Sequence, residues 1–274
     1  MSIEITIPGG EKRRLLTAGK YCPADIMVTA EGGGVDTLAA FVEGATEITS
    51  NASFVGMNAF RTNFAVKKVN FPMAAEVMAN AFYYANAIEE VYVPEALTVA
   101  EAAFYVVQKL EKVDVSKATS LGGGAFQGCE KLSQILCSDV EKIGNSTFRN
   151  CKALTELYAP KAKQLNPYMC YNCISLQYVE LGDVSGYVFN NSFNQCSALT
   201  AVVMRQTKLI TLENVNAFSN TPIANGEGYI YIPSALVQKY QAATNWSTFA
   251  NQFRSLEDYT VDGTVTGAFD RSKI

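Results

Sequence analysis

The cysteines are the residues of this chain best suited to carry chemistry. There are seven of them, and Cys170 and Cys173 form a Cys-x-x-Cys pair. A redox pair needs a thiol with a lowered pKa, and a zinc site needs two further ligands. The chain has no second Cys-x-x-Cys pair and no histidine. The recurrence of Cys129, Cys151, Cys173 and Cys196 at a nearly constant spacing favours a column of buried thiols instead.

The lack of histidine excludes several enzyme classes. Ser-His and Cys-His nucleophile pairs, histidine-ligated zinc and histidine acid–base catalysis all require that side chain. The glycine run Leu121–Gly124 lacks the Gly-Lys-Ser/Thr of a phosphate-binding loop, and a tight corner of the fold explains it better. We therefore expect a protein without enzymatic activity, cofactor or metal site.

Charge and hydropathy also narrow the class of partner. The formal net charge is -4, and the densest basic run is Lys12–Arg14. Binding to nucleic acid needs clustered cations, so we expect no nucleic-acid partner. No stretch approaches the roughly 18 apolar residues that a membrane-spanning helix needs. The N-terminus, Met1–Glu4, has neither the charged nor the apolar region of a secretory signal.

A 22-residue period governs the middle of the chain. Phenylalanine recurs at this spacing, and aliphatic residues follow it six and nine positions later. A period in this range is typical of a solenoid, in which each repeat buries its apolar face against its neighbours. The columns are Phe60, Phe82, Phe104, Phe126 and Phe148, with Cys170 in the sixth place; Val66, Ile88, Leu110, Leu132, Leu154 and Leu176; and Val69, Val91, Val113, Ile135, Leu157 and Val179.

The last of these columns predicts a sheet. Apolar and polar residues alternate around it, as in Val69–Phe71, which is the pattern of a half-buried strand. Strands that recur at a fixed spacing must run parallel, one in each repeat. The return half of each repeat, around Ala81 and Phe82, is expected to be a helical turn or loop. The predicted fold class is thus an α/β repeat solenoid with a parallel β-sheet.

The pattern divides the chain into four segments. Residues 1–34 are predicted to form a small β module, with strands at Ile3–Ile7 and Ile26–Thr29 and a glycine linker after them. Residues 35–54 depart from the columns and are predicted to form an N-terminal cap, and residues 55–233 form the solenoid. Residues 234–274 are predicted to form a helical cap, with a helix over Ala235–Ala243, and a β-hairpin within Tyr259–Phe269.

Residues that alternate with the buried strand positions should face outward and stack into two rows. The rows are Lys68, Glu90, Lys112, Gln134, Glu156 and Tyr178; and Asn70, Tyr92, Asp114, Leu136, Tyr158, Glu180 and Val203. Solenoids bind partners through such extended faces. The candidate binding residues are Tyr92, Asp114, Tyr158, Tyr178 and Glu180. The alternative is that these rows only stabilise the sheet.

The repeat resembles the BspA-like leucine-rich repeat of type 5, I-G-x-x-A-F-x-x-C-x-x-L-x-x-V-x-x-P. The best copy is Ile143–Leu157, and the resemblance covers residues 55 to 233. Early copies depart from it, because Asn63, Ala85 and Val107 replace the column cysteine. The resemblance implies a leucine-rich-repeat solenoid. It also implies a role like that of bacterial surface or secreted adhesins, which bind host proteins or other cells.

The flanking segments resemble a different group. Leu16–Ala30 is similar to a short module near the start of tail-associated proteins of Firmicutes phages and prophages, and Leu256–Gly263 is similar to endings in the same group.

From the repeats, we expect a recognition protein that binds a host protein or cell-surface glycan through the sheet face. The alternative is a structural or assembly component of a phage tail. The expected location is extracellular, at a cell surface or on a virion, and the oligomeric state is left open.

Overall fold

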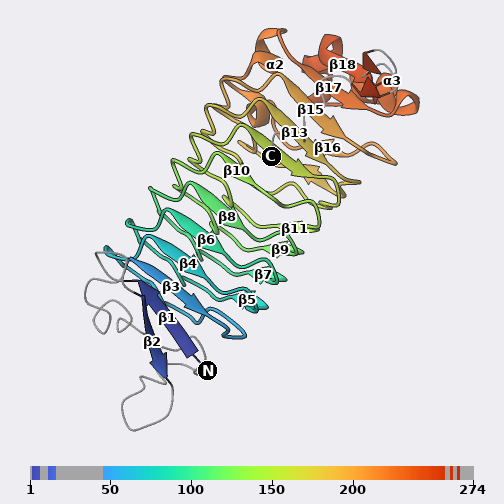
Figure 1. The fold of residues 1–274 in the computed structure, drawn as a ribbon. Coiled ribbons are helices and arrows are strands. Elements are labelled where there is room, and N and C mark those ends of the chain that lie inside the picture. Colours follow the sequence, from blue (N-terminus) through green and yellow to red (C-terminus); the bar gives the residue numbers. More distant parts are fainter. Residues whose placement is uncertain (1, 7–11, 17–45, 257–259, 262–263, 266–274) are drawn as a thin grey trace.

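The computed structural model describes residues 2–6, 12–16, 46–256, 260–261 and 264–265. In Figure 1 the repeats stack side by side along one axis, each contributing a strand to a long curved face. The predicted α/β repeat solenoid is confirmed. Most of each repeat is turn and short strand, and the helices lie near the C-terminal end.

The main sheet follows the predicted strand column. Its first part contains parallel strands β3 (Glu47–Ser50), β4 (Lys68–Asn70), β6 (Glu90–Tyr92), β8 (Lys112–Asp114) and β10 (Gln134–Ile135). Its second part contains parallel strands β12 (Glu156–Ala159), β13 (Tyr178–Leu181), β15 (Ala201–Met204), β17 (Tyr229–Ile232) and β18 (Phe253–Ser255). Among the described strands, no pairing joins β10 to β12, so the sheet has two parts.

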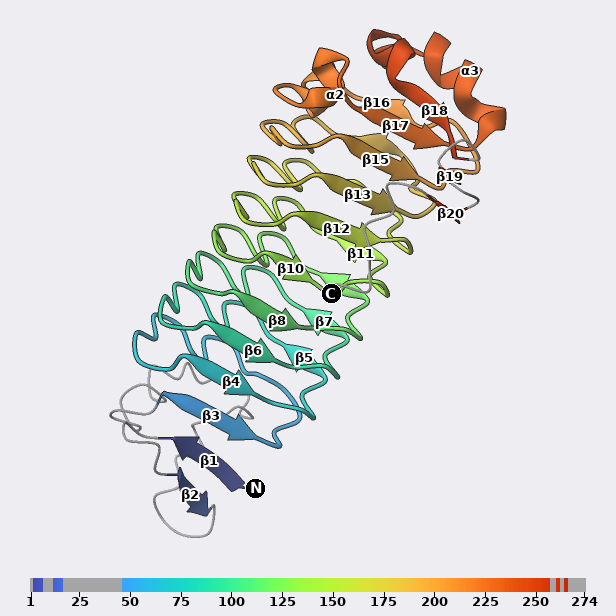
Figure 2. The ribbon, with the colours of Figure 1, turned by 45° about the horizontal axis from the view of Figure 1, so that its top comes forward.

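A second parallel sheet runs behind the main one and was not predicted. Its strands are two residues long, and each carries an apolar residue five positions before the aromatic column, or six positions before it in the last strand. They are β5 (Glu76–Val77), β7 (Thr98–Val99), β9 (Ser120–Leu121) and β11 (Lys142–Ile143), followed further along by β14 (Tyr187–Val188) and β16 (Thr211–Leu212). Figure 2 shows these short strands beside the longer ones.

The return half of each repeat is a turn without helix, which agrees with the loop named as one of its two predicted forms. The residues two before and two after the aromatic column have positive φ, for example Asn80 at 57° and Tyr84 at 56°. This conformation turns backbone N–H groups toward the next repeat. The amide of Phe82 donates to the carbonyl of Ala103 at 2.7 Å, and that of Phe104 donates to Ala125 at 2.7 Å. Neighbouring turns are therefore joined by the same hydrogen bonds throughout, which fixes the 22-residue register.

The core is a stack of buried rings along the axis. Phe60, Phe82, Phe104, Phe126 and Phe148 lie nearly parallel, with centroid separations of 4.9, 4.7, 5.0 and 5.8 Å. Each of these side chains is almost fully buried. Removing one would leave a large cavity, which costs about 3–5 kcal/mol of stability in a packed core.

The cysteine column packs beside the rings and is buried as predicted. Cys129 Sγ donates to the carbonyl of Phe104 at 3.0 Å, and Cys151 Sγ donates to that of Phe126 at 3.1 Å. Burial raises the pKa of each column thiol. Cys170 fills the phenylalanine position, and burial raises its pKa as well. A lowered pKa, which redox chemistry would need, is found at neither cysteine of the Cys-x-x-Cys pair.

The N-terminal strands extend the main sheet. β1 (Ser2–Thr6) pairs antiparallel with β3 on one side and with β2 (Lys12–Leu16) on the other. The strand predicted at 3–7 is thus found at nearly the same place. The predicted strand at 26–29 and the glycine linker lie outside the described residues. Because β3 already pairs with β4, the parallel part of the sheet begins within the segment predicted as a cap.

The C-terminal segment closes the core with helices. The helices are the 3-10 helix η1 (Val215–Phe218), α2 (Pro222–Asn225), α3 (Ser234–Ala242) and the 3-10 helix η2 (Trp246–Gln252). α2 contributes Ile223 to the core, and the other three bring aromatic residues to the end of the ring stack. Trp246 is fully buried against Phe218 and Tyr240. The helix predicted over 235–243 is confirmed. The predicted hairpin is present as the antiparallel pair β19 (Thr260–Val261) and β20 (Thr264–Val265), whereas β18 was not predicted.

Candidate binding face of the main sheet

The two predicted rows of outward side chains are in register on the main sheet. Lys68 lies opposite Glu90, and Glu90 lies opposite Lys112. In the second row, Asn70 lies opposite Tyr92, and Tyr92 lies opposite Asp114. Parallel pairing without a shift places equivalent residues of successive repeats beside one another, so the 22-residue spacing predicted these neighbours.

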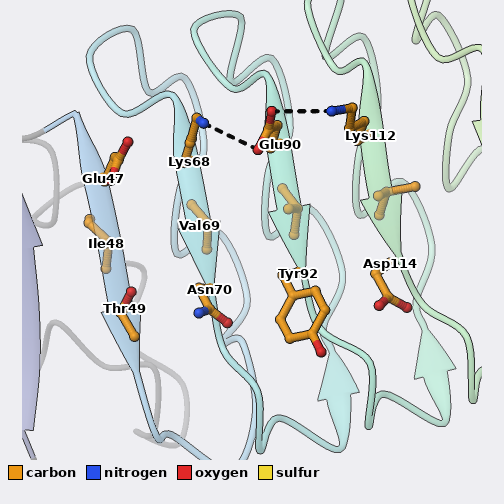
Figure 3. A pocket seen from close by; sticks show the side chains of 12 residues that line it. Glu47, Ile48, Thr49, Lys68, Val69, Asn70, Glu90, Tyr92, Lys112 and Asp114 are labelled. Carbon is orange, nitrogen blue, oxygen red and sulfur yellow. Dashed lines mark ion pairs between the residues drawn. The ribbon is translucent and has the colours of Figure 1, made fainter.

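The first four solenoid strands form a shallow hollow of about 450 Å³. Figure 3 shows that its side chains come from the same three positions of each strand. The lining residues are Glu47, Ile48 and Thr49 of β3; Lys68, Val69 and Asn70 of β4; Glu90, Val91 and Tyr92 of β6; and Lys112, Val113 and Asp114 of β8. We call this surface the open face.

Charges alternate along the first row of the open face. Lys68 Nζ lies 3.4 Å from Glu90 Oε2, and Lys112 Nζ lies 3.8 Å from Glu90 Oε1, so one carboxylate bridges two ammonium groups (Figure 3). All three side chains are more than a third exposed. Exposed ion pairs contribute about 0–1 kcal/mol to stability, so this row remains available to a partner's charges at small cost.

The second row carries the groups best suited to direct contact. Tyr92 is 46% exposed, and Figure 3 shows its ring between Asn70 and Asp114. Among the described residues, Asn70 Oδ1 is buried and accepts no hydrogen bond. A buried carbonyl oxygen without a donor carries a free-energy penalty. The exposed Tyr92 ring is therefore the group of this row that a ligand can reach.

The predicted binding residues of the second half do not share this exposure. Tyr178 is 5% exposed and Glu180 is 2% exposed, so the expectation that they face solvent is wrong. The Tyr178 hydroxyl donates to Glu180 Oε2 at 2.5 Å, and Arg205 Nε donates to Glu180 Oε1 at 2.8 Å. Tyr158 is half-buried. Of the five predicted residues, only Tyr92 and Asp114 line the open face.

Packing on the outer side of the sheet explains this difference. Tyr178 and Val203 form a small apolar cluster, and Ala201, Tyr231 and Leu256 pack against it. Leu256 follows β18 directly, so this residue reaches the outer side of the sheet there. The sequence could have predicted this burial, because the outer rows change from mainly charged residues in the first repeats to Tyr178, Val203 and Tyr231 in the later ones.

The site residues that sequence reasoning missed are Glu47 and Thr49. They lie in the segment predicted as a cap, where the step to the next repeat is 21 residues, as the pairing of Ile48 with Val69 shows. A search that allowed the period to shorten by one residue would have found them. Among the described residues, no group of three or more His, Cys, Asp and Glu could hold a metal ion.

The comparison with known families decides the identity of the fold. A model of the BspA type leucine rich repeat region matches the chain in six copies, over residues 44–155 and 119–243. The chain belongs to the BspA-type leucine-rich repeat family. Proteins of this family are generally surface-associated and bind other proteins, and they are typically not enzymes. The match begins after the N-terminal flank and ends before the C-terminal flank. The resemblance of these flanks to phage tail proteins stays a prediction.

The chain is also similar to solved structures of other leucine-rich repeat proteins. The T. pallidum leucine-rich repeat protein is 19% identical, with a TM-score of 0.50, and the match covers 55% of this BspA-type chain and 74% of that one. A leucine-rich repeat protein from Eubacterium ventriosum is 24% identical with a TM-score of 0.44, over 61% of this chain and 49% of that one. No match was found among curated protein sequences. No helix in the described parts of the chain is long and apolar enough to cross a membrane.

Proposed function

We propose that this chain is a non-enzymatic recognition protein that binds a protein partner at a cell surface through the open face. The observation that carries this proposal is the contrast between the two parts of the main sheet. The face is hollowed over β3–β8, whereas Tyr178, Glu180 and Val203, at equivalent positions of β13 and β15, are buried. A ligand therefore has access to the first half of the sheet.

The charge pattern favours a protein over a polyanion. Glu47, Lys68, Glu90, Lys112 and Asp114 alternate in sign, so no extended region of one charge is present. A protein surface can place its own acidic and basic groups opposite such a pattern, which gives specificity and orients the encounter. A cell-surface glycan, the other ligand class predicted from the sequence, would gain less from paired charges of both signs.

The proposal is tested by replacing Tyr92 with the photo-crosslinkable residue p-benzoylphenylalanine. Crosslinking to surface proteins of candidate target cells, followed by mass spectrometry, should identify one dominant partner. The matched control carries the same residue at Tyr187, which is 51% exposed on the second sheet. If both positions crosslink the same proteins to the same extent, the open face is not the binding site.

The partner so identified allows a quantitative check. Tyr92→Ala should weaken its binding by about tenfold or more, because exposed aromatic residues commonly dominate protein interfaces. Lys68→Glu with Lys112→Glu should weaken it further and change its dependence on salt, because the face then carries charges of one sign. The alternative, a structural component of a phage tail, rests on the flanking segments alone and stays a prediction.

A further inference from the structure

A second hollow lies on the turns behind the sheets, away from the open face. Its volume is about 470 Å³, and it shares no residue with the open face. It spans three successive repeats and is lined by Glu101, Ala102, Tyr105, Gly123, Gly124, Gln127 and Asn145. We call it the turn hollow. It contains two glycines of the run that the sequence explained only as a corner.

An aromatic ring forms one wall of the turn hollow. The residues directly after the aromatic column form a row of planar groups: Arg61 lies over the ring of Tyr83 at 5.0 Å, and Tyr83 stacks on Tyr105 at 5.0 Å. The next member is Gln127, whose Nε2 donates to the Tyr105 hydroxyl at 3.5 Å. One face of Tyr105 is therefore covered by Tyr83, Gln127 lies along its other side, and part of the ring borders the hollow.

Gly124 opens this side of the ring. A Cβ atom at Gly124 would lie 3.7 Å from Tyr105 Cδ2 and 3.6 Å from Gln127 Oε1, so a longer side chain would occupy the hollow. Gly124 has a φ of 61°, but this backbone conformation does not demand glycine here. The equivalent residues of other repeats have the same conformation with side chains: Asn58, Asn80, Ala102 and Ser146, at φ between 53° and 60°. The missing side chain thus has a local consequence, which is the space beside Tyr105.

The other two glycines of the run differ from Gly124. A Cβ atom at Gly122 would lie 2.5 Å from the backbone nitrogen of Glu101, so close packing requires glycine there. A Cβ atom at Gly123 would meet only the carbonyl of Asn145, at 3.6 Å. Gly123 and Gly124 are therefore both free of a packing requirement, and both border the turn hollow.

We propose that the turn hollow binds a neutral saccharide of one or two sugar units. The apolar face of a sugar ring can pack on Tyr105, as apolar C–H groups do on aromatic faces. The amides of Gln127 and Asn145 offer both donors and acceptors to sugar hydroxyls, and the Glu101 carboxylate can accept from two neighbouring hydroxyls. The backbone of Gly123 and Gly124 lets the sugar approach closely.

Charge and size narrow the ligand class. No cation is among the lining residues, and Glu101 is an anion, so phosphorylated, sulfated and sialylated ligands are disfavoured. Two steps between repeats span about 10 Å at roughly 4.8 Å per strand. This length fits a disaccharide, with Tyr105 below one ring and Asn145 at the far end.

The test is titration of the full chain with cellotetraose, maltotetraose and chitotetraose at millimolar concentration, followed by NMR of the ¹⁵N-labelled protein. At least one sugar should shift the side-chain amide signals of Gln127 and Asn145. Gly124→Asn fills the hollow with a residue type that the column already uses, and it should weaken binding by about tenfold or more without lowering the unfolding temperature. Tyr105→Ala should also abolish binding.

Two controls separate the turn hollow from other surfaces. Tyr171→Ala removes a ring at the equivalent position of a later repeat, where it contacts Arg149, and should leave sugar binding unchanged. Tyr92→Ala removes the exposed ring of the open face and should also leave it unchanged. The proposal is overturned if none of the three sugars shifts these signals, or if folded Gly124→Asn binds as the wild type does.

Discussion

Each thiol of the cysteine column donates a hydrogen bond to a carbonyl of an earlier repeat. Cys173 Sγ lies 2.9 Å from the carbonyl of Phe148, and Cys196 Sγ lies 2.9 Å from that of Cys170. The protonated thiol is the form that makes this bond, and burial also opposes the charged thiolate. The column therefore stabilises the fold only while its thiols stay protonated.

This leads to a prediction about alkaline pH. Burial raises the pKa of Cys137 to about 12, and it raises the pKa of the column thiols as well. Above about pH 9 the unfolded chain loses thiol protons that the folded chain keeps, so the unfolded state is favoured as pH rises. Each such thiol should lower the free energy of unfolding by about 1.4 kcal/mol per pH unit. Urea unfolding followed by circular dichroism between neutral and alkaline pH measures this slope.

Cys137→Ala provides the control for this prediction. The variant is less stable at neutral pH because a buried thiol is lost, but its stability should fall less steeply at alkaline pH, since one titrating group has been removed. An identical slope in the two proteins would show that Cys137 does not contribute to the alkaline loss of stability.

For single residues, the sequence predicted on which side of the strand a side chain lies but not whether it is exposed. The period correctly gave the side of the strand on which Tyr92, Asp114, Tyr178 and Glu180 lie, because side chains alternate along a strand. It did not give their exposure. Exposure depends on what packs over the sheet from elsewhere in the chain, and the contact of Leu256 with the Tyr178 cluster comes from far along the sequence.

At the scale of elements, the turns carry conformational strain that the sequence only partly relieves. Val106 has a φ of 55°, which is unusual for a β-branched residue, whereas the equivalent residues of later repeats are Asn150 and Asn172. Val106→Asn should raise the free energy of unfolding by about 0.5–1 kcal/mol, because asparagine adopts this conformation more readily. Denaturant unfolding of the wild type and variant measures the difference.

The reverse exchange serves as the matched control. Asn150→Val should destabilise the protein, both through strain and because Asn172 Nδ2 loses its acceptor, Asn150 Oδ1, now at 3.0 Å. If Val106→Asn is destabilising while Asn150→Val is neutral, packing of the valine side chain outweighs backbone strain in these turns.

Elements differed in how far the sequence predicted them. The main sheet was predicted because its strands contain alternating residues over three positions. The second sheet was missed because strands such as Glu76–Val77 are too short to show alternation. Ion pairs between repeats join residues 22 positions apart, such as Lys117 with Glu95 at 2.7 Å and Lys163 with Glu141 at 2.7 Å. Exposed pairs of this kind contribute little to stability.

At the scale of the whole molecule, the solenoid has a discontinuity near its middle. The main sheet divides between β10 and β12, and the second sheet has no described strand between β11 and β14. The ring stack is widest at 5.8 Å between Phe126 and Phe148, and Cys170 then takes the place of a ring. Because each repeat of a solenoid contacts mainly its neighbours, this is where coupling between the two halves is weakest.

We therefore expect the halves to unfold separately when one is weakened. Phe82→Ala should destabilise the first half by about 3–5 kcal/mol and produce an intermediate in which the later repeats remain folded. Hydrogen exchange measured by mass spectrometry should then show β4, β6 and β8 exchanging before β13 and β15.

Phe193→Ala is the corresponding change in the second half. Phe193 is fully buried and stacks on Phe218 at 5.4 Å, so its loss should reverse the order of exchange. A single transition in both variants, with all strands exchanging together, would show that the discontinuity does not divide the molecule.

The constant hydrogen bonding between turns also gives the solenoid a fixed rise per repeat. The amide of each column residue donates to the equivalent carbonyl one repeat later, so one interior repeat presents nearly the same contacts as another. The separation between the open face and the helical end is therefore set by the number of repeats between them, at roughly 4.8 Å each. Duplication or loss of a single 22-residue unit would change the reach of the protein in fixed steps while leaving both ends chemically intact.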